Sequence, residues 1–469
     1  MRPPAPEIFR ECDIRGIFGR DLDVETGEAV GRAFATVLDG VPGARTVVCG
    51  HDNRASSEAL YAAAIRGLTG AGGDVAAIGL AVTPMMYFAV RHLRARGGLM
   101  VTASHNPPEY NGIKLTDGAG ALHGAQIRRL REIALAGTAG PVAAGGCGRP
   151  AGSVAVQEIR GPYTAMLADK IRLGPRRLRV VVDCGNGTAG AVTPAVLRGW
   201  GCDVVPLYCD LDPAFPHHHP DPVEPRNLAD LIRAVREERA DLGIGLDGDG
   251  DRLGVVDDRG EILWGDRLMA LFWREVLRAH PGSIALVEVK CSQALVDEIR
   301  RLGGRPEWTK TGHSLVQARM REVGAVFAGE MSGHLFFADE YFGYDDAIYA
   351  AGRLLRMLSH TDRPLSALVA EIPRYHTTPE IRAACPDERK FEIVAALTDE
   401  FRGRYDVIDV DGARVVFPDG WALVRASNTQ PALVLRAEGK TADALARATA
   451  VVDAALRRYP GIGPVRWNA

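Results

Sequence analysis

Strand-like apolar runs followed by glycine-containing turns recur along the chain, and helical periodicity precedes or follows them. Three such runs lie at residues 46–50, 180–185 and 284–287. A helix is expected from Leu228 to Arg239, where apolar residues recur at intervals of three and four. Buried strands that alternate with amphipathic helices are typical of α/β domains. The pattern therefore predicts an α/β fold.

The length of the chain and two segments of linker-like composition predict several domains. At roughly 100 to 200 residues per domain, a chain of 469 residues holds three or four. Residues 136–152 are rich in Gly, Ala and Pro, and residues 373–379 begin and end with Pro, as is typical of connections between domains.

Composition and charge exclude several classes of protein. A net charge of −3 argues against a nucleic-acid-binding surface, which normally carries a basic excess. The eight cysteines form no Cys-x-x-Cys pair, so we expect neither a disulfide framework nor a structural zinc site. The sequence has no signal-peptide pattern and no apolar run of membrane-spanning length. We therefore expect a cytoplasmic protein that does not bind membranes.

Two local clusters of basic residues are interpreted as structural. Residues 176–179, Arg-Arg-Leu-Arg, are expected to form a solvated connection between a helix and a strand. His217, His218 and His219 suggest a metal site, but the flanking prolines favour an extended loop.

Two motifs carry most of the chemistry. The first, here called the serine loop, is Thr-Ala-Ser-His-Asn-Pro at residues 102–107; alone, it could be a surface turn that caps a helix. The second, here called the acidic loop, is Asp-Gly-Asp-Gly-Asp-Arg at residues 247–252. A calcium-binding EF-hand does not fit, because it needs Gly and Glu where this chain has Arg252 and Asp258. A haloacid-type phosphatase with an Asp nucleophile remains an alternative.

Taken together, the two motifs explain each other. Asp247, Asp249 and Asp251 supply carboxylate oxygens, which Mg²⁺ prefers, and the glycines between them let the loop curl inward. A phosphoserine carries roughly −1.5 to −2 charges, and one of its oxygens together with waters would complete an octahedral shell. The two motifs predict that Ser104 carries a phosphoryl group.

Further motifs lie downstream. Residues 309–314 and 329–334 each place a His in a Gly-containing turn, and residues 425–431 group Arg, Ser, Asn and Thr in the manner of a phosphate-binding loop. Lysine occurs at only six of the 56 basic positions, yet Lys114 and Lys290 both lie in motif segments. We therefore interpret both lysines as site residues.

These motifs, in this order, resemble the α-D-phosphohexomutase family, in particular its phosphomannomutase/phosphoglucomutase branch, over nearly the whole chain. The resemblance implies three similar mixed α/β domains and a smaller C-terminal α+β domain around a central cleft. We expect these domains to carry, in turn, the serine loop, the acidic loop, the sugar-recognition loop and the phosphate-binding loop, and to span residues 1–152, 153–260, 261–372 and 373–469.

The resemblance also implies an activity. A phosphomannomutase/phosphoglucomutase moves a phosphoryl group reversibly between the 1- and 6-positions of mannose or glucose phosphate, through a phosphoserine and a bisphosphorylated sugar. The resemblance further implies one Mg²⁺ per chain and glucose 1,6-bisphosphate or an equivalent as activator, and we expect a monomer. Two alternatives stay open: a phosphoglucosamine mutase, and a non-catalytic sugar-phosphate-binding protein. Cys12, where the branch has Tyr, favours the second, whereas Met331 favours the manno/gluco branch.

The resemblance assigns roles residue by residue. Ser104, Asp247, Asp249 and Asp251 would bind the metal, with Ser104 as the phosphoryl carrier and Arg252 as added positive charge. Proton transfer would fall to one of Arg15, Lys114, His313 and His334. Contacts to the substrate would come from Lys290, His313, Glu330, Ser332, His334, Arg425, Ser427, Asn428 and Thr429.

Overall fold

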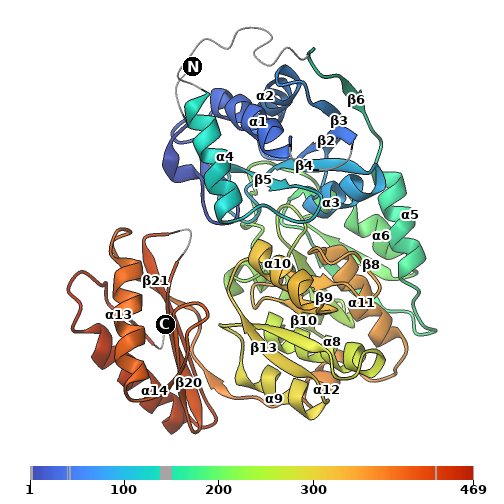
Figure 1. Cartoon of the computed structure of the whole chain (residues 1–469). Helices are drawn as coiled ribbons and strands as arrows, with labels where there is room; N and C mark the ends of the chain where they lie inside the picture. The colour runs from blue at the N-terminus through green and yellow to red at the C-terminus, as the bar shows by residue number, and fades with distance from the viewer. Residues whose placement is uncertain (1–3, 40, 42–43, 138–149, 428–429, 468–469) are drawn as a thin grey trace. The chain divides into compact units, whose positions relative to one another are not determined.

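The computed structural model describes residues 4–39, 41, 44–137, 150–427 and 430–467 (Figure 1). The chain forms two compact units. Unit 1 comprises Met1–Gly265 and Ser332–Leu368, and unit 2 comprises Asp266–Met331 and Val369–Ala469. No helix among the described residues is both long and apolar enough to cross a membrane.

The first sheet of unit 1 is mixed. Its strand order is β1-β5-β4-β2-β3-β6, where β2, β3, β4 and β6 are parallel and β5 runs antiparallel to both β1 and β4. The bounds are β1 Ile14–Ile17, β2 Ala44–His51, β3 Asp74–Leu80, β4 Ala95–Val101, β5 Tyr110–Thr116 and β6 Val154–Val156. Strand β6 follows the linker expected at 136–152 and still pairs with this sheet.

Four helices accompany the first sheet: α1 Val24–Leu38, α2 Ser57–Gly70, α3 Thr83–His92 and α4 Ala125–Ala136. Helix α1 begins at a capping side chain, because Asp23 accepts a hydrogen bond from the backbone N–H of Thr26. Helices α1 and α2 pack closely at glycines: a Cβ on Gly31 would lie 2.2 Å from the carbonyl oxygen of Ala64. Apolar residues of α1, α2 and α4 pack with those of the strands in one core.

The second sheet of unit 1 has the order β11-β10-β9-β7-β8. Strands β7, β8 and β9 are parallel, whereas β10 runs antiparallel to β9 and β11. The bounds are β7 Arg179–Asp183, β8 Asp203–Leu207, β9 Leu242–Leu246, β10 Leu253–Asp257 and β11 Ile262–Leu263; the further elements of this part are α5 Arg160–Lys170, α6 Thr193–Gly199, α7 Ala229–Glu237, β15 Leu335–Phe337, α11 Ala347–Ser359 and α12 Leu365–Val369.

Unit 2 combines a parallel sheet with an antiparallel one. The parallel strands have the order β13-β12-β14, with bounds β12 Ile284–Glu288, β13 Arg305–Thr309 and β14 Phe327–Gly329, and the helices are α8 Gly265–Ala279, α9 Gln293–Arg301 and α10 His313–Val323. The predicted strands at 46–50, 180–185 and 284–287 are therefore confirmed as β2, β7 and β12. The helix expected from Leu228 to Arg239 is confirmed as α7, which a short 3₁₀ turn at Pro225–Leu228 precedes.

The C-terminal part of unit 2 is an antiparallel sheet of order β16-β21-β20-β19-β18, with β17 also on β21. Its bounds are β16 His376–Thr377, β17 Ile381–Ala384, β18 Asp406–Ile408, β19 Ala413–Phe417, β20 Gly420–Ala426 and β21 Ala432–Gly439, with helices α13 Lys390–Arg402 and α14 Ala442–Leu456. Apolar residues of both helices and of the strands form one core. This part is the α+β structure expected at the C-terminus.

Candidate active site

The serine loop connects β4 to β5 and wraps around a buried arginine. Arg54 donates hydrogen bonds to the carbonyl oxygens of Ser104 (2.7 Å) and Asn106 (2.6 Å). Ser104 itself has a left-handed backbone, with φ 53°, and its N–H donates to the hydroxyl of Thr102 at 2.9 Å. A non-Gly residue rarely adopts this conformation without a reason. The loop is thus held in a shape that fixes the serine side chain.

The acidic loop is the turn between β9 and β10, and it meets the serine loop directly. The hydroxyl of Ser104 donates a hydrogen bond to Oδ2 of Asp247 at 2.7 Å. The other oxygen, Oδ1, accepts the backbone N–H groups of Asp251 and Arg252, each at 3.0 Å. Gly248 allows the approach, because a Cβ there would lie 2.5 Å from the carbonyl oxygen of Ser104. Two motifs more than 100 residues apart in sequence therefore form one site.

The three carboxylates of the acidic loop fit a divalent cation. Asp247, Asp249 and Asp251 are fully buried, and one oxygen from each lies within 4.8 Å of the others. Burial, followed by the charges of Asp251 and Asp249, raises the pKa of Asp247 well above its ordinary value. Oδ1 of Asp249 is buried and has no hydrogen-bond partner among the described residues. A cation bound here would stabilise all three charges and occupy that oxygen.

Lys114 supplies a positive charge within the same site. Its Nζ donates to Oδ2 of Asp249 at 2.7 Å and also to Asp251. Burial opposes the ammonium form, but the charges of Asp249 and Asp251 outweigh it and raise the pKa of Lys114 well above its ordinary value. Lys114 is therefore a fixed cation in this arrangement.

Half-buried Arg252 and the buried residues His334 and Asp345 form a chain of contacts at the end of the acidic loop. Nε of Arg252 donates to Nε2 of His334 at 2.9 Å, and Nδ1 of His334 lies 2.8 Å from a carboxylate oxygen of Asp345. Because Nε2 accepts, the ring proton belongs on Nδ1, facing Asp345. Asp345 was not predicted as a site residue, since nothing in its local sequence indicates that it faces His334.

Arg15 and His105 complete the surroundings of Ser104. Arg15, on β1, donates to Oδ1 of Asn106 at 2.6 Å and to Asp13 at 2.6 Å. Nδ1 of His105 lies 3.1 Å from Oγ of Ser104. Burial and the charges of Arg252 and Arg15 lower the pKa of His105 well below its ordinary value, so the ring is neutral near pH 7. Sequence reasoning missed His105, although its position directly after Ser104 was a usable signal.

A cluster of cations lies in unit 2. Nζ of Lys290 donates to Glu380 at 2.9 Å, and Arg382 donates to the same carboxylate at 2.7 Å. Arg425, on β20, binds Asp411 at 2.9 Å. Burial would raise the pKa of Glu380, but Lys290 and Arg382 outweigh it and lower that pKa to about 2. The predicted residues Lys290 and Arg425 thus share an electrostatic environment with Arg382, which was not predicted.

The predicted sugar-binding and phosphate-binding residues lie in both units. Glu330 accepts the backbone N–H of Gly312 at 2.6 Å, and His313 lies 3.1 Å from the hydroxyl of Ser314; all of these are in unit 2. The hydroxyl of Ser427 accepts the backbone N–H of Gln430 at 3.1 Å. Ser332 is half-buried in unit 1. Asn428 and Thr429 lie outside the described residues.

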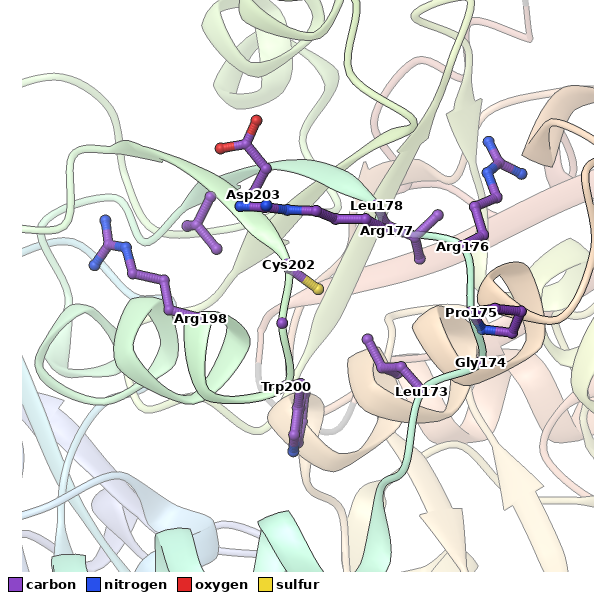
Figure 2. A pocket seen from close by; sticks show the side chains of 12 residues that line it. Leu173, Gly174, Pro175, Arg176, Arg177, Leu178, Arg198, Trp200, Cys202 and Asp203 are labelled. Atoms are coloured by element: carbon purple, nitrogen blue, oxygen red, sulfur yellow. The ribbon is translucent and has the colours of Figure 1, made fainter.

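A separate cavity of about 650 Å³ in unit 1 is lined by Arg176, Arg177, Arg198 and Trp200 among others (Figure 2). None of the predicted site residues lines this cavity. Arg176 and Arg177 lie in the connection between α5 and β7, as expected for the basic cluster at 176–179, and Arg176 donates to the carbonyl oxygens of Thr361 and Arg363. Of the three histidines at 217–219, His217 contacts Asn186 and His218 contacts Asp183.

Matches to known protein families cover nearly the whole chain. Four family models match in order, namely phosphoglucomutase/phosphomannomutase alpha/beta/alpha domains I, II and III and the C-terminal domain, at residues 6–139, 161–260, 264–375 and 380–455. The chain belongs to the phosphoglucomutase/phosphomannomutase family. The family, the enzyme class and the fold of three α/β domains with a C-terminal domain, all predicted from sequence, are thereby confirmed.

Full-length relatives agree with this assignment. A phosphomannomutase/phosphoglucomutase of Pseudomonas aeruginosa is 42% identical, covering 99% of this chain and 98% of the relative. A phosphoglucomutase of Neisseria meningitidis serogroup A is 40% identical, covering 98% of both. Among solved structures, a family protein of Burkholderia thailandensis has a TM-score of 0.89 and 38% identity, covering 98% of this chain and 99% of that one.

Proposed function

We propose that this family member moves a phosphoryl group reversibly between the 1- and 6-positions of glucose phosphate, mannose phosphate or both. Ser104 would carry the phosphoryl group, and a bisphosphorylated sugar would be the intermediate. The observation that carries the proposal is the 2.7 Å hydrogen bond between Ser104 Oγ and Asp247, in a loop of three buried carboxylates. A hydroxyl held against a metal-binding loop is suited to receive and return a phosphoryl group.

Asp247, Asp249 and Asp251 would hold one Mg²⁺ per chain. When bound, this ion would neutralise the negative charge that develops on the transferring phosphoryl group. Lys114 and Arg252 add fixed positive charge beside the same position. Asp345 and His334 orient Arg252 by the contacts described above. These positive charges would stabilise the phosphorylated form of Ser104. The reversible transfer itself would consume no energy source.

The protons need carriers at both ends of the reaction. The Ser104 hydroxyl proton faces Asp247 in the structure. When Ser104 attacks the bisphosphorylated sugar, this proton can rotate towards Nδ1 of His105, which is neutral and 3.1 Å from the same oxygen. For the sugar hydroxyl, the candidates were Arg15, Lys114, His313 and His334. Lys114 is bound to Asp249 and Asp251, and Nε2 of His334 accepts from Arg252. Arg15 is bound to Asp13 and Asn106, so each of these three must release a partner before it can move a proton.

The substrate phosphate that does not react needs a second site. We assign it to Lys290, Arg425 and Ser427 with Asn428 and Thr429, and we add Arg382 because it shares Glu380 with Lys290. Glu330 and Ser332 would bind the sugar hydroxyls, with His313 and His334 as further contacts. The enzyme would act as a monomer, with glucose 1,6-bisphosphate as its activator.

The preferred sugar is the finer question. Similarity to the phosphomannomutase/phosphoglucomutase of Pseudomonas aeruginosa and the phosphoglucomutase of Neisseria meningitidis supports mannose and glucose phosphates as substrates. A probable phosphoglucosamine mutase of Methanopyrus kandleri is also 40% identical, covering 93% of this chain and 94% of that relative. This similarity keeps glucosamine phosphate as the second candidate.

A coupled assay tests the proposal. The three substrates glucose 1-phosphate, mannose 1-phosphate and glucosamine 1-phosphate are each tested with the wild type, with Ser104→Ala and with the control Ser153→Ala, whose exposed serine binds Asp74 on β3. We expect turnover of the first two sugars by the wild type and the control, and nearly none by Ser104→Ala. Preference for glucosamine 1-phosphate would select the second candidate. Undiminished turnover by Ser104→Ala would exclude Ser104 as the carrier.

A further inference from the structure

A close pair of thiols lies outside the residues assigned to the reaction. Sγ of Cys184 and Sγ of Cys209 are 3.6 Å apart, and both cysteines are free. Cys184 directly follows β7, and Cys209 lies two residues beyond β8. These strands are parallel neighbours, with Asp183 opposite Leu207. The sheet therefore holds both thiols at the edge where the two strands end.

The two thiols differ in their access to solvent. Cys184 is fully buried, whereas Cys209 is partly exposed. The contact with Cys184 lowers the pKa of the Cys209 thiol, although burial opposes this, and the same contact together with burial raises the pKa of Cys184. Small oxidants react with the thiolate form of accessible cysteines. Cys209 is therefore the sulfur that meets an oxidant, and Cys184 is the neighbour that can resolve the product.

We propose that Cys184 and Cys209 are a redox modification site, which forms a reversible disulfide on reaction with hydrogen peroxide. The Cys209 thiolate attacks one oxygen of the peroxide, the O–O bond breaks, and hydroxide leaves as water after taking up a proton. Cys209 is then a sulfenic acid. The Cys184 sulfur attacks it, the S–O bond breaks, and the thiol proton of Cys184 leaves with the hydroxyl as a second water. Two thiols are oxidised and one peroxide is reduced to two waters.

Formation of this bond would move the turn at residues 184–188. A disulfide has a sulfur–sulfur distance of about 2.0 Å, so the two sulfur atoms, 3.6 Å apart, must approach by more than 1 Å. The turn is tied to Cys184, because the N–H of Gly187 donates to the Cys184 carbonyl oxygen at 2.8 Å. The turn is also tied to the residues on either side of Cys209, because the N–H of Asn186 donates to the carbonyl oxygen of Tyr208 at 2.7 Å and its side-chain amide donates to that of Asp210 at 2.8 Å.

The same turn supports the acidic loop. The N–H of Thr188 donates to the carbonyl oxygen of Gly248 at 2.9 Å. Gly187 also lies against Gly248, since a Cβ on Gly187 would be 2.8 Å from the Cα of Gly248. Gly248 separates Asp247 from Asp249. A shift of the turn therefore reaches the carboxylates, and we infer that the disulfide lowers turnover.

Peptide mapping under non-reducing conditions tests the chemical step. The purified full-length protein is treated with hydrogen peroxide and digested with its free thiols blocked. We expect one peptide pair joined through Cys184 and Cys209, which a thiol reductant separates. Cys209→Ser should abolish the cross-link, and the control Cys202→Ser, a buried cysteine directly before β8, should retain it (Figure 2). Sulfinic acid at Cys209 without the cross-link, or a cross-link to another cysteine, would overturn the proposal.

An activity assay tests the consequence, and this arm alone rests on the proposed function. A misplacement of about 1 Å can reduce turnover 100-fold, so we expect peroxide to lower kcat about ten-fold or more and reductant to restore it. Cys209→Ser should keep its activity in peroxide. Full activity of the cross-linked wild type would overturn the inferred control of turnover. If the reduced protein has no mutase activity, the proposed function fails, and peptide mapping still decides whether the disulfide forms.

Discussion

Within the described part of the protein, only one of the two carboxylate oxygens of Asp249 accepts hydrogen bonds. Oδ2 accepts hydrogen bonds from Lys114 at 2.7 Å and from Thr83 at 2.6 Å, whereas Oδ1 is buried without a hydrogen-bond partner there. A buried carboxylate oxygen without a partner costs free energy. This oxygen therefore marks the side of the acidic loop on which a cation would bind.

Replacement of Asp249 should weaken metal binding while the protein still folds. We expect Mg²⁺ to raise the Tm of the wild type but not of Asp249→Asn, and we expect the variant to lose at least 100-fold in turnover. A chelator should inactivate the wild type in the same way. The matched control is Asp258→Asn, which removes an acid that binds Ser366 outside the acidic loop. Equal Mg²⁺ stabilisation of Asp249→Asn and the wild type would contradict the metal site.

Asp346 is another buried acid, and we expect it to affect the stability of the fold and not the reaction. It accepts hydrogen bonds from the hydroxyls of Tyr163 at 2.9 Å and Tyr341 at 2.6 Å, and from the N–H of Tyr349 at the start of α11. Burial nevertheless raises its pKa from 3.8 to about 6. The folded state thus holds the proton of Asp346 more tightly than the unfolded state.

This shift has a defined sign in the pH dependence of stability. The contribution of protonated Asp346 is present below about pH 4 and is lost as the pH rises to about 6, a change of about 3 kcal/mol. The free energy of unfolding of the wild type minus that of Asp346→Asn should therefore decrease between pH 4 and pH 6. Tyr163→Phe removes a hydrogen bond to the carboxylate, so it should extend the window to higher pH. A difference that stays constant from pH 4 to pH 6 would contradict the shift.

Some site residues could be predicted from sequence and others could not. Ser104 and the three Asp of the acidic loop lie in short motifs whose residue types indicate their chemistry. Asp345 and Arg382 become partners of His334 and Glu380 only through tertiary packing. Neither residue lies in one of the motifs that indicate the chemistry, so periodicity and spacing contain no signal for their partners.

At the scale of elements, the segment that carries His334 joins the acidic loop through a short β-bridge. His334 pairs with Arg252, and Phe336, on β15, pairs with Asp345. The second bridge brings Asp345 close to the segment that carries His334, and the first brings His334 to Arg252. Backbone pairing therefore holds all three residues of the chain near one another.

Loss of the Asp345 charge should release Arg252 without unfolding the protein. We expect Asp345→Asn to lower kcat about ten-fold and to leave KM nearly unchanged, because in the proposed reaction Arg252 acts on the transferring group. Asp346→Asn is the control, since it should change stability and leave kcat nearly unaltered. A rise in KM with unchanged kcat would instead assign Asp345 to substrate binding.

Contact between the serine loop and the acidic loop depends on a glycine. A Cβ on Gly248 would lie 2.5 Å from the Ser104 carbonyl oxygen, whereas a Cβ on Gly70, at the end of α2, would meet nothing within 4 Å. Gly248→Ala should therefore push the loops apart and reduce turnover at least 100-fold, while Gly70→Ala should keep wild-type activity and Tm. Wild-type turnover by Gly248→Ala would show that the contact is not required.

The elements that sequence reasoning missed are short. Strands β6 and β16 contain three and two residues and lie just after or within the segments interpreted as linkers. They are held by pairing with β3 and β21, and a run this short has no detectable periodicity. The longer elements β2, β7, β12 and α7 carry enough apolar positions to reveal their period.

At the scale of the whole molecule, the proposed reaction requires two phosphate sites. We assign one to the surroundings of Ser104 in unit 1 and the other to the cation cluster of unit 2 that includes Arg425. Arg425 is the residue of its loop that can make a charged, bidentate contact with a phosphate. Sequence reasoning predicted both sites but could not show which residues surround each one.

Arg425→Ala should therefore weaken the hold on the intermediate. Hydrogen bonds to charged groups contribute about 1.5 to 3 kcal/mol, so we expect kcat/KM to fall roughly ten- to 100-fold. Lysine should restore little, because it lacks the two-pronged geometry. The variant should also need added glucose 1,6-bisphosphate to sustain turnover. Wild-type kcat/KM without that addition would place the phosphate site elsewhere.

The central claim is that Ser104 donates its phosphoryl group to the sugar, and a single-turnover experiment tests it most directly. The phosphorylated enzyme is mixed with excess glucose 1-phosphate, and the intact mass of the protein is followed together with the sugar products. We predict that one phosphate leaves Ser104 as glucose 1,6-bisphosphate forms, and that it returns as glucose 6-phosphate is released. A protein whose mass never includes a phosphate on Ser104 while it interconverts the two sugar phosphates would contradict the account.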